Sequence, residues 1–272
     1  MLVDGLPADQ IPLTDRGLLY GDGLFETFAV LDGRPLLWQR HMARLQAGER
    51  AMGFPSSDKA LLRREACQVC EGIGRGVLKI VLTRGSGGRG YRPSSQSQPR
   101  RIITLHPWPD YPQAWYTQGI SLRLCDTRFS RQSRLAGIKH LNRLEQVLAR
   151  AEWDDASIAE GLMCDEEGYL VSGTQSNLFM LQGDKLITPD LSQSGIAGVV
   201  RGLVLEQAEN FALKPRIAML RVNDLKNANA LFVTNSVMGL CPVARFEAQR
   251  YDFKKIPPEL LTLVEKSNNT ET

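Results

Sequence analysis

Short β-prone runs separated by turn signals constrain the fold of this chain more than any other feature. Apolar runs flank Asp32-Gly33, a dipeptide that favours a tight hairpin turn. Further strands are predicted at 77–83, 101–106, 120–124, 159–164, 169–171, 177–181, 185–187 and 230–234, and helices at 39–52, 58–71, 141–153, 198–211 and 257–266. Successive strands with inserted helices indicate an α+β fold, not the strand–helix–strand repeats of a Rossmann or P-loop enzyme.

A Pro- and aromatic-rich segment without helical or strand periodicity lies at residues 106–116. We therefore expect an N-terminal α+β domain at 1–110, an interdomain linker at 111–119 and a C-terminal domain at 120–272. The C-terminal domain would then carry the lysine discussed below.

The composition excludes several classes of protein. The chain has 43% hydrophobic residues, and none of its apolar runs is long enough to span a bilayer. Its first residues lack the pattern of a signal peptide, so a cytoplasmic protein is expected. A net charge of +3 does not indicate nucleic-acid binding. Cys67 and Cys70 form one CxxC without a second pair, so no metal site is expected.

Lys139 follows a small apolar stretch and precedes an amphipathic segment. Burial lowers the pKa of a lysine and makes it a nucleophile that can form a Schiff base. A lysine at the start of a helix also fits an ordinary solvated surface group, so the position alone does not decide.

The loop Gly85-Ser-Gly-Gly-Arg-Gly-Tyr91 follows a predicted strand but lacks the Lys-Ser/Thr of a P-loop. It fits either a mobile hairpin loop or a lid. In the second case Arg84 and Arg89 would present guanidinium groups to substrate carboxylates, with Tyr91 beside them.

Two further segments suit a phosphate group. The run 195–201 (GIAGVVR) opens a predicted helix, whose first backbone N–H groups can bind an anion. Residues 234–236 (Thr-Asn-Ser) follow a predicted strand with small polar side chains. Each also fits an ordinary turn.

Together these segments resemble the fold-type IV pyridoxal-phosphate family, which includes D-amino-acid and branched-chain aminotransferases. The resemblance lies in DRGLLYGDGLFET (15–27), HMARL (41–45), LTRGSGGRGY (82–91), LAGIKHLNRLEQVL (135–148), SNLF (176–179), GIAGVVR and NSVMGLCPV (235–243). The lysine and Gly–Arg segments resemble the aminodeoxychorismate lyase branch. The resemblance implies two α/β domains with the active site at their junction, and a homodimer.

The resemblance also implies the residues that bind pyridoxal 5'-phosphate. Lys139 would hold the cofactor covalently, and Arg44 would bind its phosphate. The remaining phosphate contacts would come from the amides of Gly198 and Val199 and from Ser236, with Asn235.

The implied activity is conversion of 4-amino-4-deoxychorismate to 4-aminobenzoate and pyruvate, in folate biosynthesis. Lys139 would remove the C4 proton as a general base, and either Lys139 or Thr27 would protonate the leaving group. Substrate carboxylates would meet Arg84, Arg89 and Tyr91.

Ser172 departs from the family pattern. Family members place a Glu here, opposite the pyridine nitrogen of the cofactor, and a hydroxyl cannot supply that charge. Either Asp165, Glu166 or Glu167 replaces it, or the reaction tolerates a weaker electron sink because the ring becomes aromatic. We favour the second hypothesis.

Two rival functions remain at this stage. One is a fold-type IV aminotransferase for D- or branched-chain amino acids, although Leu144 stands where those enzymes commonly carry Tyr. The other is a cofactor-binding protein that has lost turnover, which only the change at Ser172 supports.

Overall fold

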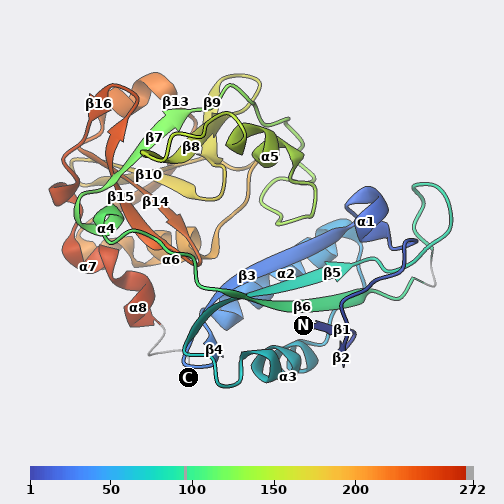
Figure 1. Cartoon of the computed structure of the whole chain (residues 1–272). Coiled ribbons are helices and arrows are strands. Elements are labelled where there is room, and N and C mark those ends of the chain that lie inside the picture. Colours follow the sequence, from blue (N-terminus) through green and yellow to red (C-terminus); the bar gives the residue numbers. More distant parts are fainter. Residues whose placement is uncertain (95–96, 268–272) are drawn as a thin grey trace. The chain divides into compact units, whose positions relative to one another are not determined.

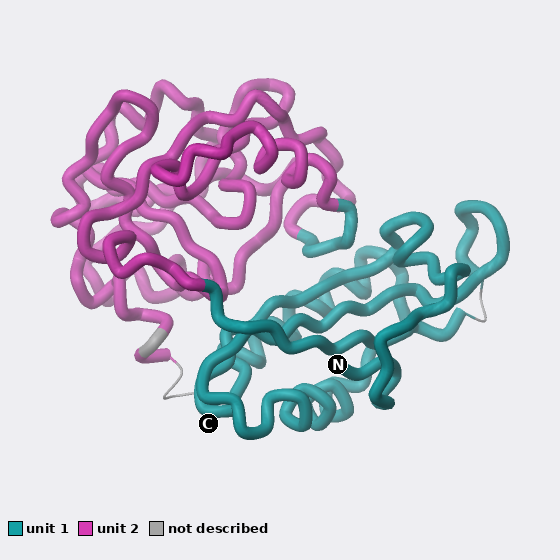
Figure 2. The backbone as a smooth tube through the Cα atoms, viewed as in Figure 1, with its two compact units in different colours: residues 1–109, 138–142, 271 teal, residues 110–137, 143–270, 272 magenta. Residues whose placement is uncertain are grey.

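The structure, a computed structural model, describes residues 1–94 and 97–267, which form two compact units. The first comprises Met1–Pro109 together with Ile138–Asn142, and the second comprises Asp110–Gly137 together with residues 143–267 (Figure 2). Both units combine helices and strands, which confirms the α+β class (Figure 1). No helix in these residues is long and apolar enough to cross a membrane.

The first unit is an antiparallel sheet with two helices packed against it. Its strands are β1 (Leu2–Val3), β2 (Leu6–Pro7), β3 (Gly23–Leu31), β4 (Arg34–Pro35), β5 (Arg75–Thr83) and β6 (Arg100–Pro107), in the order β2-β1-β6-β5-β3-β4. Its helices are α1 (Arg16–Tyr20), α2 (Trp38–Met52) and α3 (Lys59–Cys70). Apolar side chains of α2 and α3 form one buried cluster with the sheet, including Phe28, Met42, Leu62 and Leu78.

The second unit is built on a larger mixed sheet. Its described strands are β7 (Ile120–Leu124), β8 (Ile158–Cys164), β9 (Tyr169–Gly173), β10 (Asn177–Gln182), β11 (Lys185–Pro189), β12 (Lys214–Ala218), β13 (Leu220–Arg221), β14 (Ala230–Asn235), β15 (Gly239–Phe246) and β16 (Gln249–Arg250). They run in the order β12-β11-β10-β14-β15-β7-β8-β9-β13, with β16 on β15.

Short helices surround this sheet. They are α4 (Ala114–Thr117), α5 (Leu144–Arg150), α6 (Val199–Gln207), α7 (Pro258–Leu261) and α8 (Leu263–Ser267), with 3₁₀ turns η1 (Ala208–Phe211), η2 (Val222–Asn227) and η3 (Phe253–Lys255). The main core is formed by apolar side chains of β7, β8, β10, β14 and β15, such as Leu162, Leu231 and Val243.

The unit boundaries differ from the domain limits expected from the sequence. The first unit ends at Pro109, and residues 111–119, expected as a linker, group with the second unit and include α4. Lys139 groups with the first unit, because backbone hydrogen bonds join residues 139 and 141 to β3. The last five residues of the expected C-terminal domain, 268–272, lie outside the described residues.

The helix predicted at 141–153 is shorter in the structure, where α5 begins at Leu144. The preceding residues are extended because they pair with β3. Leu144 and Leu148, on the apolar side of the amphipathic segment that follows Lys139, are 75% and 60% exposed. They therefore contribute little to the core of the described chain.

The Asp32-Gly33 turn is as predicted, with both residues at positive φ (47° and 74°) between β3 and β4. We expect Gly33→Ala to lower the free energy of unfolding by about 1 kcal/mol, because an L side chain is strained at this φ. Gly74→Ala is the matched control, since an added Cβ there meets nothing within 4 Å and φ is not positive. Equal urea-denaturation midpoints for both variants would contradict this account of the turn.

Candidate active site

Lys139 is held against β3 by backbone hydrogen bonds. The amide of Phe25 donates to the carbonyl of Lys139 at 3.0 Å, and the amide of Leu141 donates to the carbonyl of Gly23 at 3.0 Å. The neighbouring Ile138 is 8% exposed and belongs to the core of the first unit. The half-buried Lys139 places its Nζ 4.1 Å from the centroid of the Phe25 ring. These backbone hydrogen bonds therefore fix the position of Lys139 beside β3.

Glu26 of β3 forms a buried ionic cluster with His41 and Arg44 of α2. Of these three residues, only Arg44 was expected from the sequence. Glu26 of β3 accepts from Arg44 Nε at 2.9 Å and Nη2 at 2.5 Å, and it contacts His41 Nδ1 at 2.6 Å. Glu26 and His41 are each 1% exposed. This bidentate contact fixes the position of the Arg44 guanidinium.

The cluster sets the charges of its members. Burial raises the pKa of Glu26, but Arg44 and His41 outweigh it and bring that pKa down to about 2. Burial also lowers the pKa of His41, against the opposing effect of Glu26. His41 is therefore neutral at pH 7, and since the ionised Glu26 can only accept, Nδ1 carries the hydrogen.

Thr27 lies on the opposite face of β3 from Glu26, because successive side chains of a strand alternate. Phe25 shares the Thr27 face, so Lys139 and Thr27 are directed to the same side of the sheet. The structure thus groups three predicted residues, Lys139, Thr27 and Arg44, in one unit.

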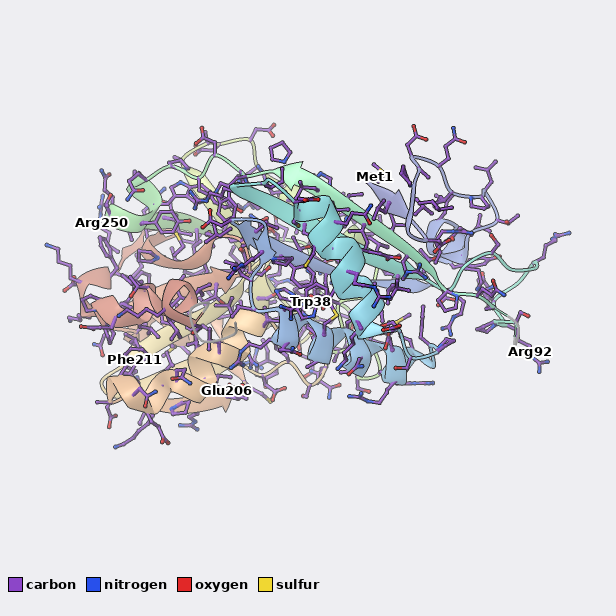
Figure 3. The ribbon with its side chains drawn as sticks, turned by 90° about the horizontal axis from the view of Figure 1, so that it is seen from below. Met1, Trp38, Arg92, Glu206, Phe211 and Arg250 are labelled. Carbon is purple, nitrogen blue, oxygen red and sulfur yellow. The ribbon has the colours of Figure 1, made fainter. Side chains whose placement is uncertain are left out.

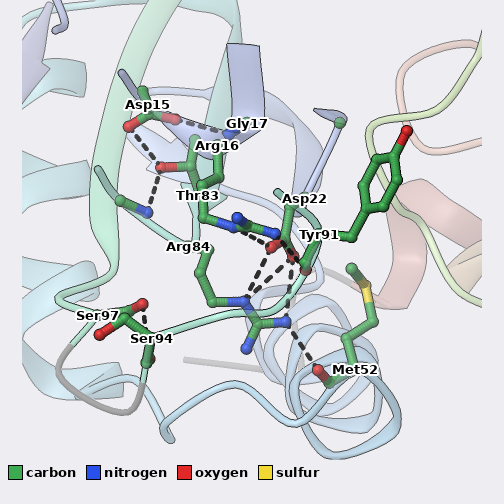
Figure 4. A network of polar contacts seen from close by, with 12 residues as sticks. Asp15, Arg16, Gly17, Asp22, Met52, Thr83, Arg84, Tyr91, Ser94 and Ser97 are labelled. Carbon is green, nitrogen blue, oxygen red and sulfur yellow. Dashed lines mark hydrogen bonds and ion pairs between the residues drawn. The ribbon is translucent and has the colours of Figure 1, made fainter. Parts of the chain in front are cut away.

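Arg84 is not available to a substrate in the way that the sequence suggested. Its Nε and Nη2 donate to Asp22 at 3.1–3.2 Å, Nη1 donates to the carbonyl of Gly53 and Nη2 also to that of Met52, both at 2.8 Å (Figure 4). Its guanidinium also stacks over the Phe54 ring at 4.0 Å. With all of these contacts inside the protein, Arg84 is a structural residue, which corrects the expectation.

Arg89 and Tyr91 lie on the exposed part of the same loop. Tyr91 is 85% exposed and Arg89 is exposed, unlike Arg84 at 7%. The adjoining Arg92 lies out on the segment between β5 and β6 (Figure 3). Arg89 and Tyr91 are therefore placed where a small molecule can reach them.

Of the predicted phosphate residues, Gly198, Val199, Asn235 and Ser236 lie in the second unit, and Arg44 lies in the first. Gly198 precedes α6, whose first residue is Val199, and Asn177 Nδ2 donates to the carbonyl of Ile196 just before it. Asn177 in turn pairs with Thr234 at the end of β14. After β14, Asn235 Oδ1 accepts from the amides of Val237 and Met238 and shapes the turn that contains Ser236.

A buried hydroxyl in this region fits an anionic ligand. Thr234 is 1% exposed, and within the described residues its Oγ1 has no hydrogen-bond partner. Such a group is costly to leave unsatisfied, and a phosphate oxygen could accept its hydrogen.

Ser172 is 7% exposed on β9, and its Oγ donates to the carbonyl of Gly173 at 2.8 Å. The turn that follows is held by Glu160 of β8, a buried residue missed in the sequence analysis. Glu160 accepts from the amides of Thr174 and Gln175 and from the hydroxyls of Thr174 and Ser176, at 2.6–3.2 Å. Asp165, by contrast, accepts from amides of its own turn, those of Glu167 and Tyr169.

Glu26 and Glu160 share a sequence signal, since each is the single charged residue of a largely apolar strand. A buried charge requires partners, so such positions predict polar clusters. Elsewhere, no group of three His, Cys, Asp or Glu side chains in the described part of the chain could hold a metal ion.

Comparisons with known proteins show what this chain resembles. The sequence model of the family Amino-transferase class IV matches residues 23–246. Aminodeoxychorismate lyase of Vibrio harveyi is 36% identical over 90% of this chain and 91% of that protein. The crystal structure of 4-amino-4-deoxychorismate lyase from Pseudomonas aeruginosa superimposes with a TM-score of 0.91 at 44% identity, covering 99% of this chain and 98% of that one. The PLP-bound form of a hypothetical aminotransferase from Mycobacterium tuberculosis shares the fold, with a TM-score of 0.83 at 21% identity over 97% and 95% of the two chains.

The low pKa of Glu26 makes stability depend on pH. The pKa of Glu26 in the folded protein, about 2, is below the ordinary value of 4.5. Its contribution to the free energy of unfolding is therefore present above pH 4.5 and is lost as the pH falls toward 2. This difference in pKa corresponds to about 3 kcal/mol of stability. We expect urea unfolding to show wild type well above Glu26→Gln in stability at pH 6, with the gap narrowing steadily below pH 4.5. If the free energies of unfolding of the two proteins stayed equally far apart at every pH, the stabilising role of ionised Glu26 would be contradicted.

Proposed function

The chain belongs to the class IV amino-transferase family, and on that premise we propose that it is a pyridoxal-phosphate-dependent 4-amino-4-deoxychorismate lyase. The proposed reaction converts 4-amino-4-deoxychorismate to 4-aminobenzoate and pyruvate. The observation that carries the proposal is the 44% identity to the lyase from Pseudomonas aeruginosa over 99% of this chain. The lyase of Vibrio harveyi supports it independently.

We propose that Lys139 holds the cofactor covalently and that Ser172 lies at its pyridine ring. Its phosphate would be bound by Arg44, Gly198, Val199, Asn235 and Ser236. The unsatisfied hydroxyl of Thr234 fits a phosphate in that place. When bound, pyridoxal phosphate supplies an electron sink for the carbon that bears the substrate amine.

The chemistry left to the protein is proton transfer. Lys139 would take the proton from C4 of the substrate, in a position fixed by its backbone bonds to β3. The leaving enolpyruvyl oxygen would receive a proton from Lys139 or from the hydroxyl of Thr27, which is directed to the same side of β3. Arg89 and Tyr91 would bind substrate carboxylates, and Arg84 would not contact the substrate.

We further propose that the enzyme is a cytoplasmic homodimer that takes only a small-molecule substrate. Support for the dimer comes from α5, where Leu144, Val147 and Leu148 are 59–75% exposed. A group of exposed apolar side chains often marks a protein interface. Light scattering of the purified chain would reject the dimer if it gave the mass of a monomer.

The product formed from 4-amino-4-deoxychorismate tests the proposed function. We expect wild type to release pyruvate and 4-aminobenzoate, and Lys139→Ala to lose about 10³-fold in turnover because its general base is gone. Lys79→Ala is the matched control: its Nζ lies 5.2 Å from the same Phe25 ring, and turnover should change less than tenfold. Amino transfer to 2-oxoglutarate without pyruvate release would instead establish an aminotransferase.

The weaker sink expected at Ser172 has its own test. Ser172→Glu introduces a carboxylate where the hydroxyl now donates to Gly173. If Ser172 faces the pyridine nitrogen, the absorption band of the bound cofactor and its pH response should shift, because the added charge favours the protonated ring. Ser172→Ala, which adds no charge, should leave the pH response nearly unchanged. The same spectrum in both variants would remove Ser172 from the cofactor site.

A further inference from the structure

The glycine-rich loop 85–91 is attached to α1 at both of its ends. At its start, Thr83 Oγ1 donates to Asp15 Oδ2 at 2.9 Å and accepts from the amide of Gly85 at 3.0 Å. The amide of Arg16 donates to the carbonyl of Gly85 at 2.9 Å. The beginning of the loop is therefore fixed by the residues that open α1.

Arg16 holds the other end of the loop. Its Nη1 donates to the carbonyl of Gly90 at 2.9 Å and its Nη2 to that of Tyr91 at 2.8 Å, while Nε donates to Asp22 Oδ2 at 2.9 Å. Arg16 is only 3% exposed, so these charged hydrogen bonds are shielded from water. One buried guanidinium thus ties two loop carbonyls to the body of the first unit.

Asp22 links Arg16 to the start of the loop. Its carboxylate accepts from Arg16, the first residue of α1, and from Arg84, which directly precedes Gly85 (Figure 4). One carboxylate thus orients two guanidinium groups, and the loop is held at its start through Arg84 and at its end through Arg16. The loop is therefore anchored, and the alternative of a mobile hairpin loop does not fit these contacts.

We propose that Arg16 is a positioning residue for substrate binding: by fixing residues 90 and 91 it holds Arg89 and Tyr91 in place for the carboxylates of the substrate. The inference rests on the proposed lyase function. Arg16 need not touch the substrate. Side chains presented on a loop that is already ordered lose less conformational freedom on binding, so the anchoring increases affinity more than it changes the chemical step.

A pair of neighbouring glycines allows the anchoring to be tested without removing Arg16. A Cβ on Gly87 would lie 3.0 Å from Arg16 Cδ and 3.4 Å from Cγ, whereas a Cβ on Gly88 would meet nothing within 4 Å. Neither glycine has a positive φ. Because the guanidinium of Arg16 is tied at three points, its side chain cannot yield to Gly87→Ala without loosening those bonds.

The experiment compares Gly87→Ala with Gly88→Ala by hydrogen exchange and steady-state kinetics. For Gly87→Ala we expect faster exchange in residues 85–92 and a KM for 4-amino-4-deoxychorismate raised about tenfold, which corresponds to the loss of one or two good contacts. Its kcat should stay within about threefold, since Lys139 is untouched. Gly88→Ala should match wild type in exchange and KM.

A second pair of variants removes the guanidinium itself. Arg16→Gln should raise both exchange and KM further, with Arg16→Lys in between because a single ammonium cannot reach all three acceptors. The affinity for pyridoxal phosphate should not change. Arg101→Gln is the control, since it breaks a bidentate contact with Glu65 in the same unit that does not involve the loop.

The possible outcomes separate the two proposals. Unchanged exchange in Gly87→Ala and Arg16→Gln would overturn the anchoring role of Arg16. Faster exchange with an unchanged KM would overturn the role of Arg16 in substrate positioning. A fall in kcat as large as the rise in KM would also overturn it. If wild type releases no pyruvate, the proposed function fails, while the exchange measurements still decide whether Arg16 anchors the loop.

Discussion

The short backbone pairing between β3 and residues 139–141 is the constraint on which the rest of the first unit's site depends. Through it, Lys139 lies beside Phe25, and Glu26, the next residue along the strand, binds Arg44 from the opposite face. One strand therefore orients the Lys139 amine on one side and the Arg44 guanidinium on the other. Two side chains nearly a hundred positions apart in sequence are thus positioned by neighbouring residues of the same strand.

Carboxylates with little exposure to solvent organise the polar groups in both units. Glu26 orients Arg44 and His41, Asp22 orients Arg16 and Arg84, and Glu160 holds the turn after Ser172. Glu26 and Glu160 are buried and Asp22 is partly buried, and each accepts several hydrogen bonds, so the donors around it are held in place. The proposed catalytic and binding groups would be ordered by these contacts before any ligand arrives.

Periodicity predicted the local structure where neighbours in sequence decide it, as in β7 (Ile120–Leu124), the Asp32-Gly33 turn and the end of α2 at Met52. It was wrong about the start of α5, because the pairing of residues 139–141 with β3 is a long-range contact that has no local signal. The absence of a local signal also explains why the sequence suggested that Arg84 contacts a substrate. A guanidinium bound by Asp22, 62 positions earlier, has the same sequence pattern as one open to a substrate. Motif resemblance singled out Lys139 and Arg44 as candidate site residues, whereas Glu26 and Glu160 were found only from their burial in the structure.

The central claim, that Lys139 carries the cofactor, is tested most directly by borohydride reduction of the purified protein with pyridoxal phosphate, followed by mass analysis of its peptides. The account predicts a visible absorption band that borohydride removes, and a stable phosphopyridoxyl label on Lys139 and not on Lys79. A label on another lysine, or no absorption band after addition of pyridoxal phosphate, would contradict it.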